Sequence, residues 1–407
     1  MIGMRRAAAV AAALWACWAV AGPAQTLPSD RVSRLAATLE REPLRRDPQT
    51  GYLRPLLAAL HLPVDSQLLV FSKTGVQQAH TGPHSPRALY FDESVVVGYV
   101  PGAPAIEIIA HDAVEGLAFY TLDQSAASPL PVRRTSCLTC HESAGTRDVP
   151  GFIVRSHTVG EDGSVLQNVM TPPSHDVDHS TSHPERWGGW LVTSEGVAPP
   201  YAQRAHQGNI TFSPEGNTSS QVFIEWMAAP PESHGYLSES SDIVSLLAFD
   251  HQMPAVNLMT RLAFEWRRAA GSGAAGPGSV AAPAVRALVD ELADYFLFVR
   301  EASMPVPLTP RAGFARALEA RVPHDAQGRS LGQLDLVTRL LRYPCSYMIY
   351  SEAFDDLPAP VKQAVYRRLI DTLSQPPGDR RFDHIAAGDR RAILEILRAT
   401  RADFPAL

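Results

Sequence analysis

The chain has few cysteines, only four among 407 residues. Cys17 lies near the N-terminus, Cys137 and Cys140 are separated by two residues, and Cys345 stands alone. Exported proteins that depend on disulfides carry many more cysteines at regular spacings. The count therefore excludes a disulfide scaffold and marks the pair at 137 and 140 as a dedicated chemical feature.

Long apolar runs and clustered positive charge are also lacking. Beyond the N-terminal segment, charge or proline interrupts every apolar stretch well before the ~18 residues of a membrane span. The formal net charge is −6, and no basic stripe exists that could neutralise phosphates. We therefore expect no spanning helix in the mature chain and no nucleic acid partner. No Gly-rich phosphate loop, Ser-His-Asp spacing or paired-carboxylate motif stands out either.

The N-terminus has the pattern of an export signal. Arg5 and Arg6 precede an apolar run that ends in Ala-Val-Ala, the small-residue spacing of a signal peptidase site. We expect residues 1–24 to be a signal peptide and the mature protein to be periplasmic or secreted. Loss of the two arginines would take the formal charge from −6 to −8. A lipoprotein anchor at Cys17, in "LWAC", is a minor alternative.

The first half of the mature chain has the pattern of strands and the second half that of helices. Short runs rich in Val, Ile, Tyr and Phe are separated by Gly, Pro and Asp, which predicts strands; they lie at 66–73, 87–100, 105–112, 116–123, 151–159 and 164–170. Two short helices are expected before them, at 31–40 and 52–61. Apolar spacing of three and four predicts further helices at 241–253, 283–302, 311–322, 331–354, 359–374 and 390–404.

These patterns predict an α+β protein with two domains. A β-containing domain would span 25–235 and carry the cysteine pair, and an α-helical domain would span 236–407. Residues 171–208, rich in Pro, His, Ser and Gly, are expected to form a long loop. The segment 271–282 is expected to be a flexible linker.

Residues 137–141 read CLTCH, the attachment pattern of c-type haem. Two cysteines at this spacing can form thioethers with the two vinyl groups of one porphyrin. His141 then lies beneath the iron as the proximal ligand. The sequence therefore assigns Cys137 and Cys140 to one covalent haem c and His141 to its iron.

Two other uses of such a pair carry less weight. A thioredoxin-like dithiol normally opens a helix in a βαβ unit, and no such unit surrounds the motif. A structural zinc site needs four ligands, which only the histidine-rich segment after 171 could complete.

The five residues of CLTCH resemble those of c-type cytochromes. The wider run "PRALYF…VGYV…FYTLDQ…CLTCH…ERWGGW" looks like a group of exported cytochrome c-domain proteins without an established role. The resemblance implies a haem and no particular reaction. An ordinary small cytochrome c is all-α with the motif near its start, whereas more than a hundred residues, many strand-like, precede Cys137 here.

The second iron ligand decides between electron transfer and ligand chemistry. Met170 is one candidate distal ligand, with a core methionine as its alternative role. His175, His179 and His183 recur every four residues, and at least two of them are expected in a solvated polar loop. His206 is preferred among the histidines. The resembling group has a His-Met pair before Gly-Asn at this place, whereas this chain has Gln after His206.

Several residues could line the haem. Trp187 and Trp190, around a Gly pair, are candidates for an aromatic haem wall, although each could equally be an ordinary core tryptophan. Arg133 and Arg134 could pair with propionates or be surface charges. His251 and Met253 are expected in the helical core. Cys345 is expected to be a small buried side chain whose pKa is raised by burial.

The sequence thus favours an exported monohaem c-type cytochrome that transfers single electrons to a redox protein partner. Two alternatives stay open: a peroxidase-like haem oxidoreductase with an open distal site, in which nearby histidines act as acid and base, and a haem-based sensor or subunit.

Overall fold

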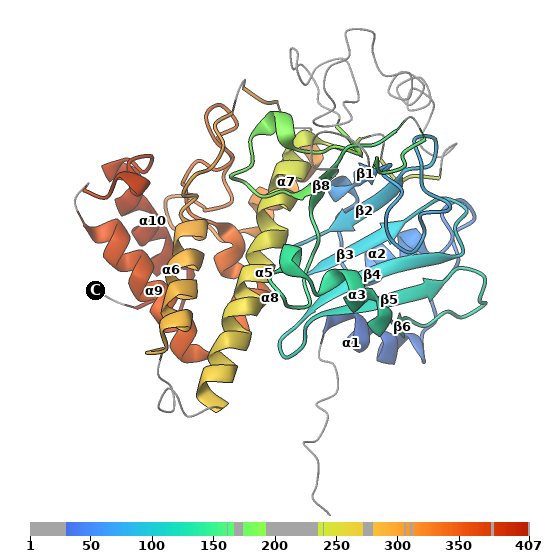
Figure 1. Ribbon diagram of the computed structural model, residues 1–407, viewed down its shortest axis with the longest axis horizontal. Helices are drawn as coiled ribbons and strands as arrows, with labels where there is room; N and C mark the ends of the chain where they lie inside the picture. The colour runs from blue at the N-terminus through green and yellow to red at the C-terminus, as the bar shows by residue number, and fades with distance from the viewer. Residues whose placement is uncertain are drawn as a thin grey trace, which may run out of the picture.

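The computed structural model of the protein describes residues 30–160, 162–166, 174–192, 235–238, 240–271, 280–304, 307–309, 312–375 and 378–405 (Figure 1). Within these ranges a β-rich first half is followed by helices, which confirms the predicted α+β fold. The expected signal peptide with Cys17, the candidates Met170 and His206, and most of the expected linker lie outside the described residues.

The first half is built on an antiparallel sheet of seven strands in the order β6-β5-β4-β3-β2-β1-β9. Its strands are β1 (Leu68–Val70), β2 (Arg87–Phe91), β3 (Val95–Tyr99), β4 (Ala105–Asp112), β5 (Gly116–Asp123), β6 (Val132–Arg133) and β9 (Trp190–Leu191). A separate hairpin pairs β7 (Arg155–His157) with β8 (Ser174–Asp176). Six strands, β1 to β5 and β7, thus lie within the expected segments. The β-branched and aromatic residues of β1 to β5 suit a sheet that is buried on both faces.

Side chains alternate between the two faces of this sheet. One face, with Tyr90, Val97 and Ile108, is covered by helices α1 (Arg31–Leu39) and α2 (Leu53–Ala59). Asp30 caps α1, since its carboxylate accepts from the backbone N–H groups of residues 32 and 33 at 2.8 and 3.0 Å.

The opposite face of the sheet packs against helix α5 (Ile243–Gly271). This helix lies between the sheet and the C-terminal helices, as Figure 1 shows. Nearly all of its first twenty residues are buried, including His251 and Met253, which confirms the expectation that both are core residues. The other helices are α3 (Leu138–His141), α6 (Pro283–Phe296), α7 (Ala312–Arg321), α8 (Glu352–Asp355), α9 (Ala359–Ser374) and α10 (Ala387–Thr400).

Short 3-10 helices connect these elements. They are η1 (Val64–Ser66), η2 (Thr135–Cys137), η3 (Ala144–Thr146), η4 (His183–Glu185), η6 (Tyr347–Tyr350) and η7 (Arg380–Phe382).

One apolar core runs across the change from strands to helices. The same cluster contains Phe91 and Phe119 from the sheet, Phe249 from α5 and Phe354 from α8. The rings of Phe91 and Phe249 lie 5.0 Å apart in an edge-to-face arrangement. The boundary between two domains at residues 235 and 236 stays a prediction. The packing joins the strand-rich half and the helical half through α5.

Two predictions about local structure are wrong. The segment expected as a helix at 331–354 is irregular up to residue 346, because Asp335 accepts the N–H groups of Val337 and Thr338 at 2.9 and 2.7 Å and closes a turn instead. The segment 171–208 is not simply a loop, since β8, η4 and β9 lie within it. Strand β9 extends the main sheet beside β1.

Candidate functional site

The CLTCH motif lies on the α5-facing side of the sheet, directly after the edge strand β6 (Figure 1). The chain passes from β6 into η2 and then into the single turn α3, so both cysteines lie on one turn of helix. Cys137 is half-buried and Cys140 is exposed, and both thiols are free. Burial raises the pKa of Cys137, with the Glu107 carboxylate as a smaller cause. The turn could therefore present two free thiols to a cofactor.

His141 is oriented by a backbone carbonyl. Its Nδ1 lies 2.9 Å from the carbonyl oxygen of Gly151, and a carbonyl can only accept, so Nδ1 carries the proton and donates it. Nε2 then holds the lone pair, which is the arrangement of a metal-binding histidine. The ring packs on Phe119, with ring centroids 4.8 Å apart. Burial lowers the pKa of His141, which favours the neutral imidazole that can bind a metal.

A residue of α5 holds the segment that orients His141. Asn257 accepts from the N–H of Phe152 at 2.7 Å and donates to its carbonyl at 2.8 Å. The adjacent Gly151 donates its N–H to the carbonyl of His141 at 2.8 Å. A β-carbon at Gly151 would lie 2.6 Å from Oδ1 of Asn257 and 2.7 Å from Cβ of Thr146, so only glycine fits. Neither Gly151 nor Asn257 was identified from the sequence.

Beside the motif, the sheet carries a row of half-buried side chains, some apolar and some charged. Leu89 and Ile109 are half-buried and pack against the same core as Cys137. Arg87 and Glu107 form an ion pair of 3.6 Å there. Nε of Arg87 and Oε1 of Glu107 are buried and have no hydrogen-bond partner within the described residues. Orphaned buried polar atoms of this kind normally call for a ligand or water, so this row is a place where a polar cofactor edge could bind.

The two arginines before the motif have protein partners. Arg133 forms an ion pair with Glu115, and Nε of Arg134 donates to Oγ1 of Thr121 at 2.8 Å. A role in binding propionates stays a prediction for both.

Both candidate wall tryptophans are buried in the core beside α5. The indole N–H of Trp187 donates to Asp250 at 2.9 Å, and that of Trp190 donates to the carbonyl of Arg155 at 2.8 Å. A β-carbon at Gly189, between them, would lie 2.6 Å from Cβ of Ser72. Trp190 is therefore hydrogen-bonded to the backbone of β7. A role in the haem wall stays a prediction for both tryptophans.

The histidine-rich segment is less solvated than expected. His179 is buried, and its Nδ1 lies 2.8 Å from Nδ1 of His251, whose Nε2 lies 2.6 Å from Ser346. His183 is buried as well, so the expectation of solvated side chains for at least two of the three is wrong. His175 is half-buried, with its Nε2 2.8 Å from the carbonyl oxygen of Glu185. The physical reason is that β8 and η4 fold this segment back onto α5 and the residues near 300.

A buried ion pair that the sequence did not indicate lies next to this segment. The guanidinium of Arg186 is 3.4 Å from the Asp250 carboxylate, and both side chains are almost fully enclosed. Burial raises the pKa of Asp250 to about 7, although Arg186 and the Trp187 indole lower it. Cys345 is also fully buried, and burial raises its pKa to about 12, as expected for an inert thiol.

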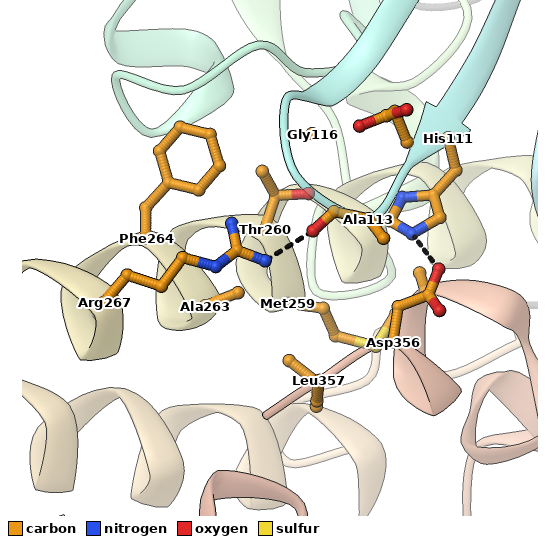
Figure 2. Close-up of a pocket in the computed structure, with 12 residues that line it drawn as sticks. His111, Ala113, Gly116, Met259, Thr260, Ala263, Phe264, Arg267, Asp356 and Leu357 are labelled. Atoms are coloured by element: carbon orange, nitrogen blue, oxygen red, sulfur yellow. Dashed lines mark hydrogen bonds and ion pairs between the residues drawn. The ribbon is translucent and has the colours of Figure 1, made fainter. Parts of the chain in front are cut away.

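A small cleft opens between the β4–β5 hairpin and helices α5 and α8 (Figure 2). Figure 2 shows His111 facing Asp356 across it, with Nε2 3.1 Å from Oδ2, and Arg267 reaching the carbonyl of Ala113. Its space of about 230 Å³ includes the open mouth. A β-carbon at Gly116, on its rim, would lie 3.1 Å from the carbonyl oxygen of Pro150. The cleft thus adjoins the chain that orients His141.

Comparison with family models, curated proteins and solved structures finds no match to this chain. In the described ranges, no group of three or more His, Cys, Asp or Glu side chains is arranged to hold a metal ion. No helix there is both long and apolar enough to cross a membrane.

Proposed function

We propose that this protein is an exported monohaem c-type cytochrome that passes single electrons to a redox protein partner. Cys137 and Cys140 attach the haem, and His141 binds its iron through Nε2. The observation that carries the proposal is the CLTCH turn together with the donation from Nδ1 of His141 to Gly151 at 2.9 Å. That bond leaves the one nitrogen free that the iron needs.

Attachment consumes no other reagent than the reduced thiols. Each S–H of Cys137 and Cys140 would add across one vinyl double bond, with sulfur on one carbon and hydrogen on the other, so the whole mass of the haem would be retained. The exposed Cys140 and the half-buried Cys137 are both free for this addition. When bound, the haem supplies an iron that alternates between the ferric and ferrous states.

The chain's own residues set the conditions for that exchange. The hydrogen bond from Nδ1 to the Gly151 carbonyl makes Nε2 of His141 a stronger electron-pair donor to iron, which favours the ferric state. Phe119 covers one side of the ring and keeps water away from it. The orphaned Nε of Arg87 is a donor of the kind that a propionate carboxylate accepts.

The test is direct. The mature protein from a host that can attach haem should give a c-type pyridine haemochrome spectrum, should retain haem after acid-acetone extraction, and should gain the mass of one haem. Cys137→Ala with Cys140→Ala should lose covalent haem, whereas Cys345→Ala, the matched control, should keep it. A protein that carries no covalent tetrapyrrole under these conditions contradicts the proposal.

A further inference from the structure

The β7–β8 hairpin lies against the turn that follows the haem motif. Arg155 and Asp176 form an ion pair across this hairpin, with Nε 2.7 Å from Oδ1. A β-carbon at Gly145, in η3 just after His141, would lie 2.6 Å from Nη2 of Arg155 and 2.8 Å from Oδ2 of Asp176. The face of the hairpin that carries this pair is therefore turned towards the motif.

His157 lies on the same face. Side chains two positions apart in a strand point to one side, so His157 follows Arg155, and its cross-strand partner Ser174 follows Asp176. Ser156, between them, points the other way: it is fully buried, and its hydroxyl accepts the N–H of Gly188 at 2.9 Å. His157 thus lies on the hairpin face that is turned towards η3, and not on the buried face of Ser156.

The ring of His157 has one nitrogen engaged and one available. Nδ1 lies 2.7 Å from the hydroxyl of Ser174, and within the described part of the chain Nε2 makes no hydrogen bond. Burial, with the charges of Arg155 and Arg87 as further causes, lowers its pKa to about 4, so the imidazole is neutral at ordinary pH.

The other histidines described in this part of the chain are buried in the core or bonded to another segment. His179 is paired with His251 in the core, and Nε2 of His175 is at hydrogen-bonding distance from the carbonyl of Glu185. His183 is enclosed beside Trp187. Among the described candidates, His157 alone combines a half-buried ring, an Nε2 without a hydrogen bond and a position on the hairpin face that is turned towards η3.

We propose that Nε2 of His157 is the second protein ligand of the haem iron, opposite His141, with Ser174 fixing the ring through Nδ1. This inference rests on the proposed function, since it needs the haem on His141. A second imidazole closes the iron, which suits electron transfer and gives a lower reduction potential than a methionine ligand would.

The test compares the holoprotein with two variants of the same hairpin. Wild-type ferric protein should be low-spin by electron paramagnetic resonance, and the ferrous protein should bind carbon monoxide slowly. His157→Ala should lose the low-spin signal, bind carbon monoxide rapidly, and regain the low-spin signal when imidazole is added. His175→Ala, on the opposite face of the hairpin, should behave like the wild type.

His157→Met keeps the inference testable if His157→Ala does not fold. A methionine at this position should replace the imidazole on the iron, add a near-infrared charge-transfer band and raise the reduction potential. A wild-type iron without a second protein ligand overturns the inference. A His157→Ala or His157→Met protein with an unchanged spectrum overturns it too, and would point to His206 or Met170 as the second ligand. A normal haemochrome in all proteins shows that such a failure leaves the covalent haem itself intact.

Discussion

At the scale of single residues, the orientation of His141 depends on atoms that are distant in the sequence. Asn257 contacts Phe152 across 105 positions, and that contact positions the Gly151 carbonyl. The CLTCH spacing was enough to predict the attachment residues. It could not indicate Asn257 or His157, because a single asparagine in a helix or a single histidine in a strand does not reveal which distant residue its side chain will contact.

Asn257→Ala should destabilise the protein substantially. The substitution leaves the N–H and carbonyl of Phe152 buried without their partner, which costs about 2–4 kcal/mol in the free energy of unfolding. Thr260→Val is the matched control one turn along α5, because the hydroxyl of Thr260 has no partner within the described residues and should lose less than ~1 kcal/mol. Urea unfolding measures both. Equal losses would show that Asn257 does not hold this segment.

His183 should make stability depend on pH. Burial lowers its pKa to about 4, while an unfolded histidine titrates near ~6.5. Between these values the unfolded chain binds a proton that the folded chain does not, so this contribution is present above pH ~6.5 and is lost as the pH falls towards ~4. Asp250 and Glu301, whose pKa values burial raises to about 7, act in the opposite direction, so variants must be compared.

The comparison is between His183→Asn and His80→Asn, since the side chain of His80 is exposed. His183→Asn should flatten the fall in unfolding free energy between pH ~6.5 and ~4 by up to about 1.4 kcal/mol per pH unit. His80→Asn should keep the wild-type slope. Parallel curves for all three proteins would contradict a buried, neutral His183.

At the scale of elements, apolar periodicity predicted most helices well and failed where side chains compete for the backbone. Helix α9 (Ala359–Ser374) begins and ends where its pattern does. The segment 331–346 has similar apolar content, but Asp335 captures the backbone N–H groups that a helix would use, and the next residue, Leu336, has a φ of 59°. Apolar periodicity depends only on the spacing of apolar residues and does not detect a turn closed by a polar side chain.

Asp335→Ala therefore distinguishes this turn from the expected helix. The loss of an acceptor shared by Val337 and Thr338 should cost about 1–2 kcal/mol of unfolding free energy. In an exposed helix the same change is slightly stabilising, because alanine has the higher helix propensity. Asp371→Ala, on the exposed side of α9, is the control and should raise the midpoint of thermal unfolding a little. A stabilising Asp335→Ala would support the helix instead.

At the scale of the whole molecule, the order of strands and helices suggested two domains, whereas the packing runs through α5 without a break. Phe249 contacts Phe91 in the sheet at a centroid distance of 5.0 Å and Trp190 of β9 at 5.9 Å. The His111–Asp356 pair adds a polar link between β4 and α8. Sequence pattern alone could not reveal this, because a helix buried on all sides has no polar face to mark where a domain ends.

Phe249→Ala tests whether the two halves unfold together. Truncation of this buried ring should cost about 3–5 kcal/mol, through lost apolar contact and the cavity left behind. Because the core is shared, helix content followed by far-ultraviolet circular dichroism and the environment of Trp187 and Trp190 followed by fluorescence should shift to the same lower denaturant concentration. Trp226 and Trp266 also contribute fluorescence, so a background with Trp226→Phe and Trp266→Phe restricts the signal to Trp187 and Trp190 in the mature chain. Two separate transitions, with only the tryptophan signal moved, would show that the sheet and the C-terminal helices are independent cooperative units.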